Sequence, residues 1–134
     1  MEKELTIAIP KGYLFGECTD LLKKAGYEVL FALNALECID SARVNQPDLI
    51  LMDVILPDIE GPDLCRYIKK DPELKGTYVV LTSHQRTDSF EQAVGLDAGA
   101  DDYIASSVSN NELTARVNSM VRILKAERER EACY

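Results

Sequence analysis

Short apolar runs alternate with amphipathic stretches along nearly the whole chain, and this alternation strongly limits the folds that it can adopt. Five runs have the character of strands, at residues 5–9, 27–31, 49–54, 78–81 and 102–105. The stretches between and after them have helical spacing, at residues 14–24, 35–44, 61–70, 88–98 and from 112 onward. Five β–α units in strict alternation predict an α/β fold: a doubly wound parallel sheet with helices on both faces.

The apolar positions predict which parts of each element are buried. The run at residues 49–54 is the most apolar, as expected for a central strand covered on both faces. The expected inward faces are Leu14, Cys18, Leu21, Leu22 and Ala25 in the first helix; Leu36, Ile39 and Ala42 or Arg43 in the second; Leu64, Cys65 and Ile68 in the third; and Leu113, Val117, Met120, Val121 and Leu124 in the last. Gly26 and Gly99 are the expected helix stops.

Length and charge exclude several classes of function. A chain of 134 residues fits one compact domain. The net charge is −8, and residues 48–102 hold −7 of it, so direct binding to nucleic acid is disfavoured. No apolar run is long enough to span a bilayer, and the charged start Met1–Glu4 does not resemble a signal peptide. The four cysteines show no metal-binding spacing and are expected to be reduced thiols in a cytoplasmic protein.

The C-terminal segment differs in composition from the rest of the chain. Residues 1–124 form the predicted domain, and residues 125–131 are almost all charged with good helix propensity. Two interpretations of residues 125–134 remain open: a solvated helical tail, or a linker helix toward a possible output domain.

Ligands of open α/β sheets bind beyond the carboxyl ends of the strands, which directs attention to four loops. These are residues 9–12, 53–58, 82–84 and 105–107. His84 lies in one of them, but no nucleophile and acid form a triad pattern with it. Asp58 and Glu60 are expected to serve the turn and the N-terminus of the third helix. No acid–base or nucleophile constellation predicts an enzyme.

Three segments together resemble the receiver domains of response regulators. They are the stretch 46–61 (QPDLILMDVILPDIEG), Leu81-Thr82-Ser83, and the stretch 95–103 (GLDAGADDY). The resemblance covers residues 5–124 and implies a flavodoxin-like (βα)5 fold in a single domain, with strand order 2-1-3-4-5. It also implies a two-component signal-transduction role.

The resemblance assigns expected roles to four residues. Asp53 stands where receivers accept a phosphoryl group, and Thr82 stands where a hydroxyl contacts that group. Tyr103 stands where an aromatic ring switches between outward and inward rotamers. Ile55 would offer its backbone carbonyl to Mg²⁺.

Two departures from the family pattern affect the same site. Receivers have an acidic pair that holds Mg²⁺ at the end of the first strand, where this chain has Ile9-Pro10. They have a Lys-Pro pair after the fifth strand, where this chain has Ser106-Ser107. Because phosphoryl transfer needs the moving oxygens neutralised by metal and cation, we expect weak or absent Mg²⁺ binding and no other cofactor. The sequence therefore predicts an atypical receiver.

Lys11 is a further candidate in the first loop. Its ammonium could neutralise Asp53 in the space that the metal would occupy, or it could be a solvated surface lysine. The opening, residues 5–25, also resembles in part the N-terminus of ATP phosphoribosyltransferases. A Lys11-Gly12 turn that enters a helix could hold an anion, which suggests an anion or small-molecule binder as one alternative function.

Two receiver hypotheses remain besides that alternative. In the first, the chain signals through contacts with a protein partner: a histidine kinase, an output domain or a second copy of itself. In the second, Asp53 is a conventional phosphoacceptor modified by a histidine kinase. Neither involves a membrane or direct nucleic-acid contact.

Overall fold

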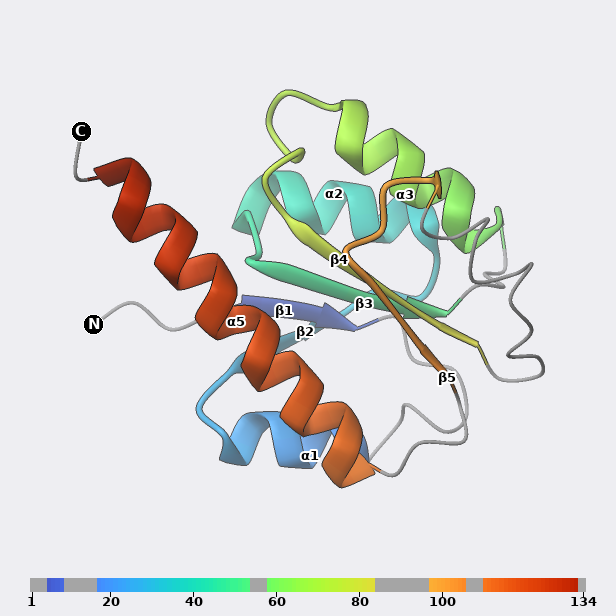
Figure 1. The fold of residues 1–134 in the computed structure, drawn as a ribbon. Helices are drawn as coiled ribbons and strands as arrows, with labels where there is room; N and C mark the ends of the chain where they lie inside the picture. Colours follow the sequence, from blue (N-terminus) through green and yellow to red (C-terminus); the bar gives the residue numbers. More distant parts are fainter. Residues whose placement is uncertain (1–4, 9–16, 54–57, 84–96, 106–109, 133–134) are drawn as a thin grey trace.

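The computed structural model describes residues 5–8, 17–53, 58–83, 97–105 and 110–132. Five parallel strands form one sheet in the order β2-β1-β3-β4-β5 (Figure 1). Their bounds are Leu5–Ala8 for β1, Glu28–Phe31 for β2, Leu49–Asp53 for β3, Tyr78–Ser83 for β4 and Asp102–Ala105 for β5. The flavodoxin-like order predicted for the sheet is therefore confirmed.

Helices cover both faces of the sheet (Figure 1). They are α1 (Glu17–Lys24), α2 (Ala35–Asn45), α3 (Gly61–Lys70) and α5 (Asn110–Ala132). One apolar cluster joins α2 and α3 to Ile50, Met52, Val79, Leu81 and Tyr103. A second joins α1 and α5 to Leu49, Leu51, Val80 and Ile104. Because β3 contributes alternate residues to both clusters, all five of its residues are buried, as its composition predicted.

Most element bounds agree with the sequence prediction. The third helix and the fifth strand are confirmed as predicted, while β4 continues through Ser83 and α5 begins two residues earlier than residue 112. Gly26 and Gly99 both have φ of +100°, which suits glycine at a helix end. Residues 9, 14–16 and 54, and most of the helix predicted at 88–98, lie outside the described residues.

Two expected inward positions are wrong. Ala25 is exposed because α1 ends at Lys24 and Ala25 lies in the following turn. Leu36 is 64% exposed because the inward face of α2 is Ala35, Cys38 and Ala42, one residue out of phase with the predicted face. Ile39 is only partly buried. Small inward residues allow α2 to lie close to the sheet, and Leu36 is left outside.

Two of the four cysteines have side chains that the structure describes. Cys38 and Cys65 are free and buried. Burial raises the pKa of Cys38 to about 12 and that of Cys65 to about 11, so both thiols stay protonated at neutral pH. They act as small apolar groups of the core.

Asp58, in the loop between β3 and α3, caps α2 and not the third helix as the sequence suggested. Its carboxylate accepts hydrogen bonds from the backbone N–H of Ala35 (2.9 Å) and of Leu36 (3.1 Å). Asn34 adds a side-chain cap by accepting from Glu37 N–H at 2.8 Å. The backbone hydrogen bonds that the Asp58 carboxylate accepts, the one from Ala35 foremost, lower the pKa of Asp58 below its ordinary 3.8. The loop that follows the Asp53 strand is thereby tied to a second helix.

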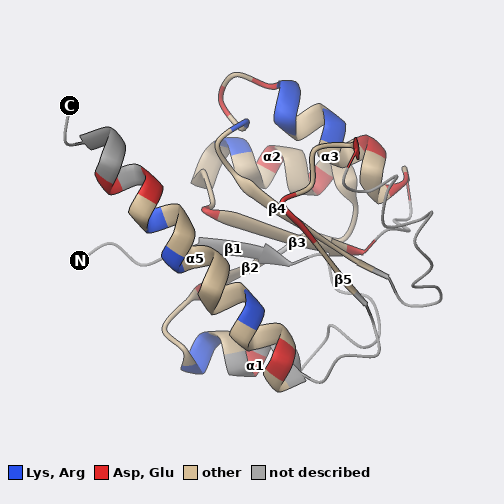
Figure 2. Cartoon of the chain, in the orientation of Figure 1, with Lys and Arg blue, Asp and Glu red and all other residues tan. Residues whose placement is uncertain are grey.

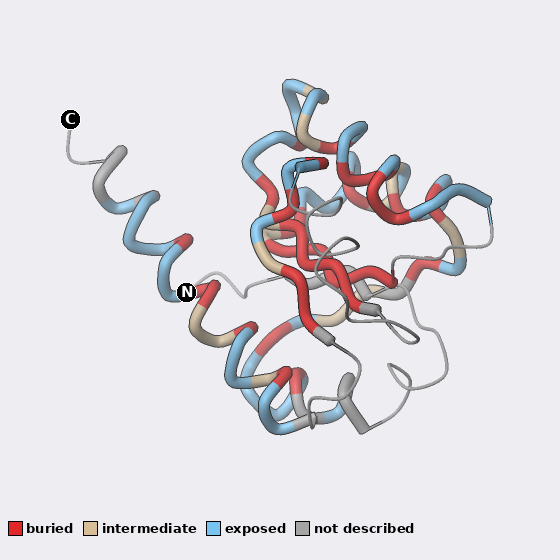
Figure 3. Tube along the Cα trace, turned by 45° about the vertical axis from the view of Figure 1, so that its right-hand side comes forward, coloured by how far each residue is buried: buried red, intermediate tan, exposed pale blue. Residues whose placement is uncertain are grey.

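The last helix continues past the core. Leu124 is the last buried residue among the α5 residues whose burial is described, and the helix runs on to Ala132 (Figure 3). The Tyr78 hydroxyl donates a hydrogen bond to the Glu127 carboxylate at 2.8 Å, which attaches this extension to the first residue of β4. Burial, and then the bond to Glu127, raise the pKa of Tyr78 to about 12. The charged segment is therefore helical and continuous with α5.

Two substitutions test this packing, one at a buried aliphatic residue of α3 and one at the exposed Leu36 of α2. Ile68→Ala empties a fully buried position of the α2–α3 cluster and should lower the free energy of unfolding by about 2–5 kcal/mol. Leu36→Ala removes an exposed side chain and should change that energy by about 0.5 kcal/mol or less. Urea unfolding followed by circular dichroism measures both. A large loss in Leu36→Ala would show that the predicted phase of α2 was right.

The Asp58 cap can be tested by its pH dependence. Asp58→Ala should lower the urea midpoint at pH 7, because the carboxylate stabilises the fold when ionised. A lowered folded-state pKa gives stability that is present above the ordinary value of 3.8 and lost as the pH falls through the folded value. The difference between wild type and variant should therefore shrink below about pH 4. Glu60→Ala is the matched control, since the Glu60 side chain makes no cap hydrogen bond to α3.

Candidate functional site

Asp53 ends the central strand at the carboxyl edge of the sheet. Its side chain is 2% exposed, and its register partner on β4 is Thr82, which is also buried. Neighbouring parallel strands lie about 4.8 Å apart, and residues in register point to the same face. The two site residues predicted on β3 and β4 are therefore side by side.

A side-chain hydrogen bond fixes Thr82 in this position. Its Oγ1 donates to the backbone carbonyl of Met52 at 3.2 Å, one residue before Asp53. The β-branched side chain has few rotamers in a strand, so the hydroxyl stays at the strand end beside the carboxylate. The apolar run of β4 ends at Leu81, and Thr82 follows it near the carboxyl end of the strand.

Tyr103 occupies a different place from the other two residues. It pairs in register with Leu81, so its ring lies on the opposite face of the sheet from Thr82. The ring is 7% exposed and belongs to the cluster that α2 and α3 cover. β4 lies between Tyr103 and Asp53 in the sheet. The structure thus brings Asp53 and Thr82 together and holds Tyr103 inward on the other face.

The remaining candidates, Lys11, Ile55 and Ser106, lie outside the described residues, as do Ile9, Pro10 and His84. Within the described ranges no three His, Cys, Asp or Glu residues are grouped to hold a metal ion. Asp58, the nearest described acid after Asp53 in the chain, has its carboxylate engaged at the start of α2. No helix among the described residues has the length and apolar character needed to cross a bilayer.

The arrangement limits the chemistry of the site. A buried carboxylate can attack the phosphorus of a phosphodonor and form an acyl phosphate while the bond from phosphorus to the donor's leaving group breaks, with the neighbouring hydroxyl donating to a phosphoryl oxygen. The low-dielectric surroundings make the added negative charge costly unless cations neutralise it. Phosphorylation at this position therefore needs a neutralising cation beside the carboxylate.

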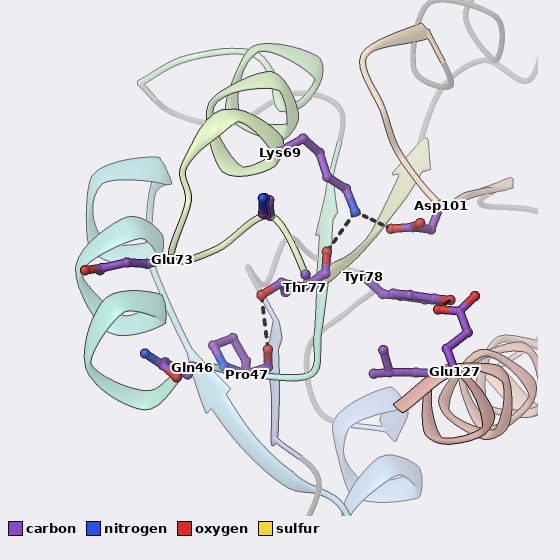
Figure 4. A pocket seen from close by; sticks show the side chains of 11 residues that line it. Gln46, Pro47, Lys69, Glu73, Thr77, Tyr78, Asp101 and Glu127 are labelled. Carbon is purple, nitrogen blue, oxygen red and sulfur yellow. Dashed lines mark hydrogen bonds and ion pairs between the residues drawn. The ribbon is translucent and has the colours of Figure 1, made fainter. Parts of the chain in front are cut away.

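A second polar cluster lies at the amino end of the same strands. A pocket of about 450 Å³ there is lined in part by Lys69, Thr77, Tyr78, Asp101 and Glu127 (Figure 4). Lys69 donates to Asp101 at 2.7 Å and to the Thr77 carbonyl at 2.9 Å. The same Asp101 oxygen accepts from Val79 N–H at 2.8 Å. These bonds join α3 to the starts of β4 and β5, and their polar groups already have partners within the fold.

Sequence reasoning missed Asp58 as the cap of α2 and Lys69 as the link to Asp101. A local signal existed for the start of α2, since Asn34 is followed three residues later by Glu37. The other contacts span 22 to 32 residues, and no sequence spacing predicts them.

Comparison with known sequences agrees with this geometry. The response regulator receiver domain family matches residues 14–118. The alkaline phosphatase synthesis transcriptional regulatory protein PhoP of Bacillus subtilis is 33% identical over 101 residues, which are 75% of this chain. The chain spans 41% of that regulator's length.

Solved structures give the same result. A structure described as a response regulator from Chloroflexus aurantiacus is 28% identical, with a TM-score of 0.82 over 90% of this chain and 99% of the other. The signal receiver domain of a histidine kinase from Syntrophus aciditrophicus is 27% identical, with a TM-score of 0.78 over 93% and 92%. With the paired Asp53 and Thr82, these matches identify the chain as a member of the response regulator receiver domain family.

Proposed function

We propose that this receiver works as an atypical module, signalling through protein contacts, in which Mg²⁺-dependent phosphorylation of Asp53 is impaired. Receiver domains interact with histidine kinases and output domains in two-component systems. The observation that carries the proposal is the sequence around a buried carboxylate. Ile9-Pro10 replaces the acidic pair and Ser106 replaces the lysine that the family supplies.

The physical argument concerns the charge balance during transfer. Mg²⁺ binds through carboxylates and water in near-octahedral geometry, and Asp53 with one backbone carbonyl is a weak ligand set. Phosphorylation would add charge to the side chain of a residue that is only 2% exposed. Without the metal and the lysine, the transition state loses most of its electrostatic stabilisation. If Mg²⁺ bound at all, Asp53 and the Ile55 carbonyl would hold it.

The proposed output is through contacts of the domain surface. The charged extension of α5 is a candidate linker to an output domain, which agrees with the 41% coverage of the regulator from Bacillus subtilis. The proposed partners are a histidine kinase, that output domain or a second copy of the chain, in the cytoplasm. Tyr103 and Thr82 are the proposed switch residues.

A conventional phosphoacceptor is the second candidate. It is favoured by the register of Asp53 with Thr82, which places a hydroxyl beside the acceptor without any change in the sheet. The two candidates differ in one measurable quantity, the yield of phosphorylated Asp53.

Intact mass spectrometry after incubation with Mg²⁺ and acetyl phosphate measures that yield. We expect no stoichiometric gain of one phosphoryl group and no shift of the melting temperature on addition of Mg²⁺ alone. An acid-labile, stoichiometric gain that is absent in Asp53→Ala would support the conventional receiver instead.

A variant that restores the family residues should gain the phosphorylation that the same measurement detects. Ile9→Asp, Pro10→Asp and Ser106→Lys together return the acidic pair and the lysine to the family positions. We expect this triple variant to gain a phosphoryl group that depends on both Mg²⁺ and Asp53. Failure of the folded triple variant to react would show that the three departures are not what prevents phosphorylation.

We further propose that Lys11 neutralises Asp53. The support is that a cation follows directly after the lost acidic pair, in the loop at the carboxyl end of β1. This strand pairs with β3, and its last described residue, Ala8, is in register with Leu51, two residues before Asp53. An ammonium near a buried carboxylate offsets part of the cost of burying that charge.

A double-mutant cycle tests Lys11. Lys11→Gln should lower the free energy of unfolding, and the loss should largely disappear when Asp53→Asn is present. We expect a coupling energy above about 0.5 kcal/mol from urea unfolding of the four proteins. Lys24→Gln is a control for a lysine at the end of α1. Additive effects of Lys11→Gln and Asp53→Asn would contradict the pairing.

A further inference from the structure

Three exposed aliphatic side chains surround the Asp58 cap. Leu33 is 70% exposed, Leu36 is 64% exposed and Ile59 is 40% exposed. They belong to two segments that the sequence separates, the start of α2 and the residues just before α3 (Figure 1). We call these three residues the Leu36 patch.

Backbone contacts hold the patch together. The Asp58 carboxylate accepts from Leu36 N–H at 3.1 Å and from Ile59 N–H at 3.1 Å, so the two backbones meet at one carboxylate. Glu37 accepts from Leu33 N–H at 3.3 Å, and Leu33 lies three residues before Leu36. Polar bonds thus hold three aliphatic side chains at the surface, where exposure to water is unfavourable. Their exposure is part of the local fold and is not a fraying end.

Acidic side chains predominate around the patch, and Arg43 and Arg66, which follow on α2 and α3, are paired with Asp71 and Asp63. Residues 32–42 and 58–65 contain five acidic residues and no lysine or arginine: Glu37, Asp40, Asp58, Glu60 and Asp63. Figure 2 marks acidic positions on α2 and at the N-terminal end of α3. Asp63 is paired with Arg66 at 2.8 Å, and Asp58 bonds to backbone groups. Glu37, Asp40 and Glu60 are exposed on the same two segments.

The aliphatic side chains and the acids around them together indicate what kind of segment the Leu36 patch would bind. An aliphatic centre with an acidic border complements a segment that carries aliphatic side chains flanked by Lys or Arg. A second copy of this chain is a poorer fit, because two such patches would face each other with like charges. The size of the patch, three side chains, is well below that of a permanent interface and suits a transient contact.

We propose that the Leu36 patch is a docking surface for a basic amphipathic segment of a partner protein. The contact uses the outer side of the α2 and α3 N-termini and does not involve the Asp53 carboxylate. It therefore stands independently of whether Asp53 is phosphorylated. Its affinity comes from burying Leu33, Leu36 and Ile59 and from the attraction of the surrounding acids for Lys and Arg.

The first test uses a defined probe with ¹⁵N-labelled full-length chain. A 14-residue peptide of Leu and Lys at amphipathic helix spacing is titrated, with a Leu and Glu peptide of the same pattern as control. We expect amide shifts concentrated at Leu33, Leu36, Ile59 and their neighbours with the basic peptide, and none with the acidic one. Raising the salt from 50 to 300 mM should weaken binding, because the acids contribute. Shifts spread over the whole acidic surface, or centred elsewhere, would overturn the proposal.

The second test uses variants. Leu36→Ser with Ile59→Ser should weaken binding about tenfold or more, since two aliphatic side chains are lost from the contact. Val44→Ser with Ile123→Ser is the matched control, because both residues are exposed aliphatics outside the patch. Melting temperatures establish that all variants fold. Unchanged binding by the patch variant, or an equal loss in the control, would contradict the proposal.

Sedimentation velocity tests whether a second copy of the chain occupies the Leu36 patch instead of a partner protein. We expect Leu36→Ser with Ile59→Ser to leave the sedimentation coefficient of the chain unchanged over the concentrations used for the titration. A dimer that Leu36→Ser with Ile59→Ser abolishes would assign the patch to self-association and overturn the partner proposal.

Discussion

Burial of the central strand on both faces is the constraint on which the rest of the structure depends. β3 has no polar side chain before Asp53, and its residues alternate between the cluster under α2 and α3 and the cluster under α1 and α5. Both helical layers are needed to remove this strand from water. The same burial places Asp53 at the last position of an apolar strand, at the carboxyl edge of the sheet.

The arrangement of elements follows from the sequence because it depends on local periodicity. The apolar run of β3 predicted a buried strand, and helical spacing predicted the buried face of α5, which is Leu113, Val117, Met120, Val121 and Leu124. The sequence did not predict which face of α2 is buried, because the inward residues are small and a larger leucine lies one position away. Side-chain volume favoured Leu36, whereas close approach of the helix to the sheet favours Ala35, Cys38 and Ala42.

The candidate site divides in the same way. Asp53 and Thr82 follow from motif position together with strand register, since both lie at the ends of neighbouring parallel strands. The capping role of Asp58 did not follow from the sequence, because its partners at the start of α2 are 22 and 23 residues away and its position suggested the nearer helix α3. Pro62 in the first turn of α3 removes one N–H that would otherwise need a cap there. Asp58 was thus available to satisfy donors of α2.

The length of α5 has a mechanical meaning. Its 23 residues make a rod of about 35 Å, of which the eight residues after Leu124 extend about 12 Å beyond the core. The bond between Tyr78 and Glu127 lies near the point where the rod leaves the core, so β4 and this extension share an attachment. A small tilt of α5 on the sheet would become a larger sideways displacement at the far end. Geometry alone therefore makes the C-terminal end of α5 the place where slight repacking of the domain is most easily sensed.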